Sequence, residues 1–190
     1  MTGKSVLEVG CGRGGAAHVL EKHFQTARYL GLDISEKAIH FCQSTHRKPN
    51  FDFVQGDAES LNVPPDSVDV LLNVESSHNY PDICAFYQQA NLALKPGGYF
   101  LYADSMLAES MSANVAKLRQ AGFVVQRQLD ITANIMRACE AVASKRRRLF
   151  VQEGRGGHIS NFLAAPGSEV FGAYRRGELQ YWVFKLRKDL

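Results

Sequence analysis

Near its start the chain reads Val6-Leu7-Glu8-Val9-Gly10-Cys11-Gly12-Arg13-Gly14-Gly15, a short apolar run that leads directly into glycines. The run predicts a buried strand, and the glycines predict a tight turn that a ligand can approach closely. Gly10, Gly12 and Gly15 also fit the dinucleotide-binding pattern G-x-G-x-x-G, and a structural turn without any ligand has the same letters. The stretch alone therefore predicts a strand, a turn and a helix, but not the ligand that the turn binds.

The same order of strand and helix repeats along the chain. Apolar runs cover residues 5–9, 29–33, 51–55, 68–72 and 98–103, and helical periodicity covers about 14–25, 36–46, 82–94 and 110–121. Such alternation is typical of a parallel sheet flanked by helices. Pro81 is expected in the first turn of its helix, and Lys95-Pro96-Gly97-Gly98 is expected to end that helix. We therefore predict a doubly wound α/β fold with helices on both faces of the sheet.

The pattern changes after Gly122. Residues 123–129 predict a sixth strand, 131–142 a helical stripe, and 179–186 a closing strand. Residues 153–178 are rich in glycine and weak in periodicity, which predicts a long, partly ordered loop. We predict one domain over residues 1–190, in which 1–105 form a cofactor-binding half. The remainder, 106–190, forms a substrate-side half with a long insertion at about 131–178.

Composition favours a soluble globular protein. Of the 190 residues, 45% are hydrophobic and 22% are charged. No apolar run approaches the roughly 20 residues that span a bilayer. The first residues lack the basic and apolar segments of a secretory signal, so we expect a cytoplasmic location. The cysteines form no C-x-x-C pair and have no histidine at metal-ligand spacing, which predicts free thiols and no metal site. They are Cys11, Cys42, Cys84 and Cys139.

Charge is distributed unevenly along the chain. Residues 1–95 carry 8 Lys/Arg and 11 Asp/Glu, whereas residues 96–190 carry 14 and 8. Much of the basic excess is the run Lys145-Arg146-Arg147-Arg148. An anionic partner is one interpretation of this run, and the solvated end of a helix is the other. We favour the second, because no aromatic residues are interleaved with the run.

Acidic side chains end the second and third predicted strands. Asp33 lies in Gly31-Leu32-Asp33-Ile34-Ser35, and Asp57 lies in Gln55-Gly56-Asp57-Ala58-Glu59. A carboxylate at the first position can accept hydrogen bonds from both hydroxyls of a ribose, and one at the second from an adenine amino group. Either residue alone is more commonly a cap or turn residue. Three successive strand ends that each carry a suitable group favour a nucleoside-binding site.

These motifs resemble those of the class I methyltransferases, which use S-adenosylmethionine. Residues 8–14 resemble the first motif of that family, 31–35 its second-strand acid, 56–58 its adenine motif, and 94–100 the turn into its fifth strand. The resemblance implies a seven-stranded sheet whose last strand is antiparallel. It places Gly10 and Gly12 against the methionine part of the cofactor, Asp33 at the ribose, and Asp57 with Ala58 at the adenine. The cofactor-binding residues that it implies are Glu8, Gly10, Cys11, Gly12, Asp33, Ile34, Asp57, Ala58, Asn73 and Val74.

The end of the fourth predicted strand carries the candidate for substrate chemistry. Leu72-Asn73-Val74-Glu75-Ser76-Ser77-His78-Asn79-Tyr80-Pro81-Asp82 is similar to methyltransferases of sugars, polyketides and glycolipids, in which a histidine follows this strand. With residues 171–174 and 177–182, the chain most resembles bacterial O-methyltransferases of polyketide-derived lipids. The resemblance implies methyl transfer to a hydroxyl of a small or lipid-like molecule. His78 is the candidate base because its ordinary pKa lies near neutrality, and a His78 that only caps the next helix is the alternative.

Other polar residues near the strand ends are weaker candidates. Glu75, Tyr80 and Tyr102 are expected to contact substrate, because open α/β sheets bind ligands at the carboxyl ends of their strands. Glu75 also competes with His78 as the base if burial raises its pKa. The histidines of the first two predicted helices are expected to be solvated: His18, His23, His40 and His46.

Other functions remain open at this point. The family carries helices ahead of the first strand that cover the cofactor, whereas here that strand begins within about five residues of Met1. We expect these lid helices to be absent, because the sequence is a fragment, because the gene is truncated, or because residues 131–178 cover the site instead. A non-catalytic cofactor-binding module is therefore one alternative. A nucleic-acid methyltransferase is another, although it would carry Asn/Asp-Pro-Pro-aromatic or a catalytic cysteine where this chain has Asn73-Val74-Glu75-Ser76. A nicotinamide dehydrogenase leaves Glu8 and Asp57 without a role. We therefore expect a small-molecule partner and no nucleic acid.

Overall fold

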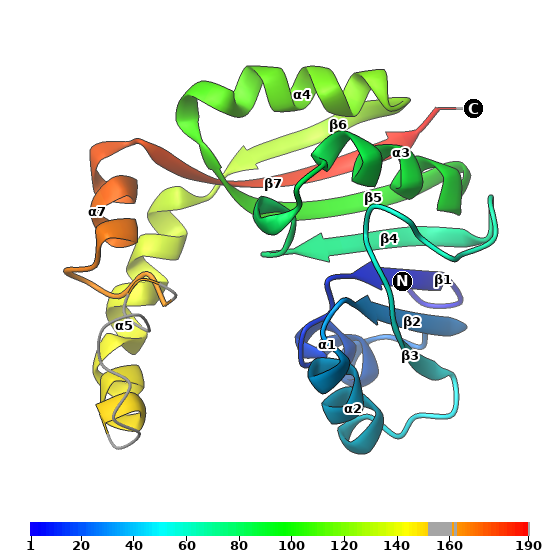
Figure 1. Cartoon of the computed structure of the whole chain (residues 1–190), viewed down its shortest axis with the longest axis horizontal. Helices are drawn as coiled ribbons and strands as arrows, with labels where there is room; N and C mark the ends of the chain where they lie inside the picture. Colours follow the sequence, from blue (N-terminus) through cyan, green and yellow to red (C-terminus); the bar gives the residue numbers. More distant parts are fainter. Residues whose placement is uncertain (152–160, 162, 190) are drawn as a thin grey trace. The chain divides into compact units, whose positions relative to one another are not determined.

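The computed structural model of the chain describes residues 1–151, 161 and 163–189, with the backbone alone at 144–151. Within these residues, seven strands form one sheet in the order β3-β2-β1-β4-β5-β7-β6. The strands are β1 (Ser5–Val9), β2 (Arg28–Asp33), β3 (Phe51–Gln55), β4 (Val68–Val74), β5 (Leu94–Leu107), β6 (Phe123–Asp130) and β7 (Leu179–Lys188). β1 to β5 pair in parallel, and β7 runs antiparallel (Figure 1). The predicted doubly wound α/β sheet with an antiparallel last strand is therefore confirmed.

The helices lie close to their predicted positions. They are α1 (Gly15–His23), α2 (Glu36–Thr45), α3 (Ile83–Ala93), α4 (Met111–Gln120), α5 (Thr132–Val151) and α7 (Glu169–Arg176), with 3-10 turns η1 (Ser77–Asn79) and η2 (Ala108–Ser110). The placement of Pro81 in a first helical turn is wrong. The carboxylate of Asp82 accepts hydrogen bonds from the backbone N–H groups of Cys84 and Ala85, both at 3.0 Å, so Pro81 lies before the cap of α3.

The stretch predicted as a long loop contains α7 in its described part. The hydroxyl of Ser168 accepts a hydrogen bond from the backbone N–H of Phe171 at 3.2 Å, and Gly177 ends the helix with a φ of 76°. Phe171 and Tyr174 are the buried residues of the helix. A capping serine, two apolar residues three apart and a terminal glycine were the available signals, and the high glycine content of 153–178 obscured them.

The prediction for the basic run Lys145–Arg148 cannot be compared with the structure at the level of side chains. The backbone of these residues belongs to α5, and their side chains lie outside the described residues. The helical stripe predicted over 131–142 is confirmed as the first half of α5. No helix among the described residues combines the length and apolar character needed to cross a bilayer.

Two compact units make up the chain. The first comprises Met1–Asp104, Ala113–Gln128 and Val183–Leu190, and the second comprises Ser105–Ser112 and Leu129–Trp182. All residues of the candidate site described below belong to the first unit. The boundary between the two predicted halves was residue 105. The first unit of the structure also includes most of α4 and most of β6, which lie after that residue.

β1 forms the centre of the first unit. Leu7 and Val9 are fully buried, as expected for a parallel strand covered on both faces. One apolar cluster joins Val6 of β1 to residues of α1, α2, β2 and β3. Its members include Ala17, Leu20, Tyr29, Ile39 and Phe51. On β5, Phe100 lies 5.8 Å from Phe86 of α3 and 5.4 Å from Phe123 of β6, between ring centroids. This packing fixes the carboxyl ends of β1 to β5 and hence the turns that follow them.

Candidate active site

The turns after four parallel strands enclose one cavity of about 420 Å³. Ligands of open α/β sheets bind at this edge, where the carboxyl ends of the strands meet. The lining residues follow β1, β2, β3 and β4 in turn: Gly10 and Gly12; Leu32, Asp33 and Ile34; Gly56, Asp57, Ala58 and Glu59; and Glu75, Ser76, Asn79, Tyr80 and Pro81. The structure thus brings together eight residues that the sequence predicted for the site: Gly10, Gly12, Asp33, Ile34, Asp57, Ala58, Glu75 and Tyr80.

The glycine turn after β1 presents two glycines with different surroundings. Gly10 and Gly12 both have positive φ, 73° and 51°, which favours glycine. A Cβ atom on Gly10 would overlap the side chain of Ser76, whereas one on Gly12 would meet no atom within 4 Å. Gly10 is therefore needed for packing, and Gly12 faces open space from which a ligand can reach the backbone.

Asp33 connects this turn to the end of β2. Its carboxylate accepts hydrogen bonds from the backbone N–H of Gly12 at 2.7 Å and from that of Ser35 at 2.9 Å. A carboxylate has about four acceptor positions, so it can accept two further hydrogen bonds from hydroxyl groups. Ile34, which follows, is 72% exposed and lines the same cavity. A carboxylate beside an exposed apolar side chain suits a nucleoside, which has a polar sugar and a flat base.

The cavity is strongly acidic. Asp33, Asp57, Glu59 and Glu75 line it, and the described lining residues include no lysine or arginine. This charge favours a ligand that carries positive charge and disfavours the anionic pyrophosphate of a dinucleotide. S-adenosylmethionine, with its sulfonium and ammonium groups, fits these residues, whereas the dinucleotide interpretation of the G-x-G-x-x-G pattern does not.

Four residues predicted to bind the cofactor do not line the cavity. Glu8 is 4% exposed and accepts a hydrogen bond from the Tyr29 hydroxyl, and burial raises the pKa of its carboxyl to about 7. Asn73 is fully buried and donates to the backbone oxygen of Val9 at 2.8 Å. Cys11 is buried, and Val74 is 44% exposed outside the lining. Glu8, Cys11 and Asn73 support the glycine turn from the core, and any direct contact of the four with the cofactor stays a prediction.

His78 lies in η1, between the cavity-lining residues Ser76 and Asn79, with its side chain 41% exposed. Its Nδ1 is 2.7 Å from Oδ1 of Asp104, and its backbone N–H donates to Oδ2 of the same carboxylate at 3.1 Å. The hydrogen bond with Asp104 raises the pKa of the imidazole above its ordinary value. Asp104, which was not predicted as a site residue, is fully buried in the C-terminal part of β5.

A signal for Asp104 was present in the sequence. Phe100, Tyr102 and Asp104 alternate with less buried residues along β5, so all three point into the core. An acidic residue that continues an apolar alternation into the core needs hydrogen-bond partners there. Its presence at the carboxyl end of a strand was the available indication of a functional carboxylate.

The three residues predicted to contact substrate differ in position. Glu75 lines the cavity with a φ of 53°, unusual for a residue other than glycine, and its N–H donates to the backbone oxygen of Ala103 at 2.9 Å. Tyr80 also lines it, and its hydroxyl lies 2.8 Å from the Ser76 hydroxyl. Tyr102 is only 3% exposed and does not line the cavity, so the structure places it behind the site rather than in it.

The solvated position predicted for His46 is wrong. Its side chain is 7% exposed, with Nδ1 3.9 Å from a carboxylate oxygen of Glu21 and Nε2 3.4 Å from the backbone oxygen of Arg13. It packs behind Gly14, where a Cβ atom would overlap the imidazole. The other histidines of α1 and α2 are exposed, as predicted: His18, His23 and His40.

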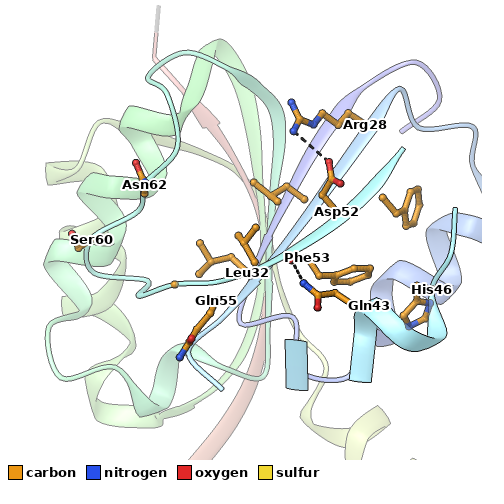
Figure 2. Close-up of a pocket in the computed structure, with 13 residues that line it drawn as sticks. Arg28, Leu32, Gln43, His46, Asp52, Phe53, Gln55, Ser60 and Asn62 are labelled. Carbon is orange, nitrogen blue, oxygen red and sulfur yellow. Dashed lines mark hydrogen bonds and ion pairs between the residues drawn. The ribbon is translucent and has the colours of Figure 1, made fainter. Parts of the chain in front are cut away.

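A larger hollow of about 620 Å³ runs along β2 and β3 (Figure 2). Figure 2 shows Leu32 and Phe53 on its walls and the guanidinium of Arg28 directed at the carboxylate of Asp52, 3.3 Å away. Asp52 is the single acidic residue among the described residues that line the hollow, and Arg28 offsets its charge, so the hollow lacks the converging carboxylates of the smaller cavity. We therefore assign the candidate active site to the smaller cavity at the strand ends.

Comparison with known proteins gives these motifs a family context. A family model described as a methyltransferase domain matches residues 2–155. A probable phthiotriol/phenolphthiotriol dimycocerosates methyltransferase of Mycobacterium ulcerans is 39% identical over 173 residues, which cover 91% of this chain and 65% of that protein. A fatty-acid O-methyltransferase of Mycolicibacterium smegmatis is 50% identical over 103 residues, which cover 54% of this chain and 38% of that protein. The chain thus spans less than two thirds of the length of either relative.

Solved structures share the fold at low sequence identity. The cyclase SpnF has a TM-score of 0.78 at 20% identity, with 100% of this chain and 76% of that chain covered. A geranyl diphosphate methyltransferase solved with S-adenosylmethionine has a TM-score of 0.73 at 16% identity, with 98% and 78% covered. These likenesses show the fold alone. A cyclase and a methyltransferase on one fold also show that activity has to be argued from the site.

Proposed function

Because this chain belongs to the class I S-adenosylmethionine-dependent methyltransferases, we propose that it transfers the donor's methyl group to a hydroxyl of a lipid-like small molecule. The pair formed by His78 and Asp104 carries this proposal. A hydroxyl acceptor has to lose a proton as its oxygen attacks, and an imidazole aligned by a buried carboxylate is suited to take it. The names of the relatives, which refer to phthiotriol derivatives and to fatty acids, support a lipid-like acceptor.

The cavity residues would hold the cofactor by the groups described above. The carboxylate of Asp33 would accept the ribose hydroxyls, Asp57 with Ala58 would bind the adenine, and the backbone at Gly10 and Gly12 would lie against the methionine part. When bound, the sulfonium supplies an electrophilic methyl group. The contribution of the chain is then to position two reactants, which is worth roughly 7–11 kcal/mol in well-oriented reactions.

The hydrogen bonds around Asp104 support Nε2 as the basic nitrogen of His78. Oδ2 of Asp104 accepts from the Ser77 hydroxyl at 2.6 Å and from the His78 backbone N–H at 3.1 Å, while Oδ1 faces Nδ1 of His78. An ionised carboxylate only accepts hydrogen bonds, so Nδ1 carries the proton and donates it. The lone pair is then on Nε2, which is the atom that takes the proton from the substrate hydroxyl.

A second candidate acceptor is the carboxyl group of a fatty acid. The 50% identity with a fatty-acid O-methyltransferase over 103 residues favours it. A carboxylate acceptor is already ionised at neutral pH and needs no base. The aligned His78 and Asp104 would then have no proton to remove, and for this reason we place the hydroxyl acceptor first.

The proposal is tested by offering the protein two matched acceptors with labelled S-adenosylmethionine: a long-chain secondary alcohol and the fatty acid of equal length. We expect a methyl ether to form at least about 10-fold faster than a methyl ester, because a positioned base accelerates only the first reaction. Mass spectrometry of the extracted lipids distinguishes the two products. Ester alone would establish the fatty-acid alternative, and cofactor binding without either product would indicate a non-catalytic module.

Removal of the Asp33 carboxylate should weaken cofactor binding without unfolding the chain. Asp33→Ala is expected to reduce the affinity for S-adenosylmethionine by at least about 1.5 kcal/mol, because two hydrogen bonds to a charged group are lost. Isothermal titration calorimetry measures the change. The matched control is Asp52→Ala on the neighbouring strand, whose carboxylate is exposed, pairs with Arg28 and lies outside the cavity lining. Equal affinities in the two variants would remove Asp33 from the site.

A further inference from the structure

A line of buried hydroxyl groups leads from the core to Asp104. The Tyr102 hydroxyl lies 2.7 Å from that of Ser77, and the Ser77 hydroxyl donates to Oδ2 of Asp104 at 2.6 Å. These three residues are 3%, 4% and 0% exposed. They connect β5 to η1, and through Asp104 they reach the imidazole of His78.

The direction of these hydrogen bonds follows from counting protons. A serine hydroxyl has one proton, and that of Ser77 is donated to the Asp104 carboxylate, which cannot donate in return. The Ser77 oxygen therefore accepts the proton of the Tyr102 hydroxyl. Burial raises the pKa of Tyr102 well above its ordinary value, so this hydroxyl stays protonated and remains a donor. Both hydroxyl protons thus point toward Asp104.

We propose that Tyr102 and Ser77 are positioning residues that set the proton affinity of His78 through Asp104. Hydrogen bonds in such a line polarise one another, so the Tyr102 hydroxyl strengthens the donation from Ser77 to Oδ2. Charge drawn toward Oδ2 makes Oδ1 a weaker acceptor for the Nδ1–H of His78. The imidazolium is then less stabilised, and Nε2 is left unprotonated at a lower pH than Asp104 alone would allow. The inference rests on the proposed function only in taking His78 as the base.

Other titratable or polar residues lie near this line of hydrogen bonds, and the variants in the test do not replace them. The pKa of the His78 imidazole is raised first by the hydrogen bond with Asp104, and the negative charge of Glu75, which follows β4, adds to the rise. Burial raises the pKa values of Tyr80 and Tyr87 to about 12, and the charge of Asp104 adds to both. The Tyr87 hydroxyl lies 3.2 Å from that of Tyr102 and 2.8 Å from Oδ1 of Asn114 on α4. None of these four residues is altered in the variants below.

The test is an NMR titration of the His78 imidazole in the full chain, without cofactor or acceptor. Tyr102→Phe is expected to raise the pKa of His78 by roughly 0.5 pH unit, since one neutral hydrogen bond is lost. Ser77→Ala, which removes the direct donor to Asp104, is expected to raise it further. His78→Gln identifies the resonance among the six histidines of the chain.

Tyr174→Phe is the matched control. Tyr174 is also a buried tyrosine, 7% exposed, and its hydroxyl donates to the Ser105 hydroxyl at 2.7 Å within the second unit. It should lose similar stability and leave the titration of His78 in place. An unchanged or lowered pKa of His78 in folded Tyr102→Phe would overturn the inference, and so would an equal rise in the control. Because the titration needs no methyl transfer, it separates this inference from the proposed function, which the acceptor assay tests.

Discussion

Replacement of His78 by Gln is expected to slow methyl transfer to a hydroxyl acceptor by roughly 10²–10⁴-fold, the range for loss of a positioned general base. The amide of glutamine cannot take a proton near neutral pH, although its size is similar. Affinity for S-adenosylmethionine should be nearly unchanged, because the cavity lining does not include His78. Single-turnover rates with saturating cofactor measure the effect. If the fatty acid is also a substrate, its methylation should be little affected, since that acceptor needs no base.

The pH dependence of the wild-type rate provides an independent check on the same residue. Only the neutral imidazole accepts a proton, so kcat/KM should rise with pH through the pKa of His78. The hydrogen bond with Asp104 raises that pKa, which places the ascending limb above 6.5, the ordinary value for histidine. The competing base is Glu75, which lines the cavity. If Glu75→Gln loses both the rate and the limb while His78→Gln keeps them, the assignment of His78 is wrong.

Replacement of Gly12 by Val should abolish measurable cofactor binding while the chain still folds. A Cβ atom at Gly12 meets no protein atom within 4 Å, so the side chain would enter the open space of the cavity. We expect the affinity for S-adenosylmethionine to fall at least about 100-fold, because the side chain would occupy the place of the ligand. Calorimetry measures binding, and circular dichroism measures folding. A folded variant with wild-type affinity would show that the glycine turn is only structural.

Substitutions at two other glycines distinguish loss of ligand binding from the effects of backbone strain and of core packing. Gly3 has a φ of 70° and a Cβ there would also meet nothing, so Gly3→Val imposes similar strain far from the cavity lining. It should lose stability and keep its affinity for the cofactor. Gly10→Ala should instead destabilise the fold itself, since its Cβ would overlap Ser76 and lie 2.9 Å from the Tyr80 hydroxyl.

The cavity at the strand ends was predictable because each part of its lining is local. Asp33 ends its strand, Asp57 and Gly12 lie within three residues of the end of theirs, and parallel strands present their carboxyl ends at one edge of a sheet. Correct strand boundaries therefore brought these residues together without knowledge of any long-range contact. The family resemblance added Glu8, Cys11 and Asn73 as cofactor-binding residues. It did not show that these three residues are buried.

The His78 side of the candidate site depends on contacts between residues far apart in the sequence. Asp104 reaches His78 across 26 positions, and Tyr102 reaches Ser77 across 25. Pairs of this kind leave no periodicity that a single sequence displays. His46 was misplaced for the same reason, because its burial results from packing behind Gly14, about 30 residues earlier. α7 was missed because local glycine content outweighed a short helical pattern.

The four carboxylates that line the cavity would distinguish the methyl donor from its by-product by charge. S-adenosylmethionine has a sulfonium and an ammonium group against one carboxylate, so its net positive charge would be attracted to Asp33, Asp57, Glu59 and Glu75. The by-product has a neutral thioether in place of the sulfonium and no net charge, so the same four residues would attract it less. The acidic lining would therefore favour the donor over the by-product, and added salt would reduce that preference.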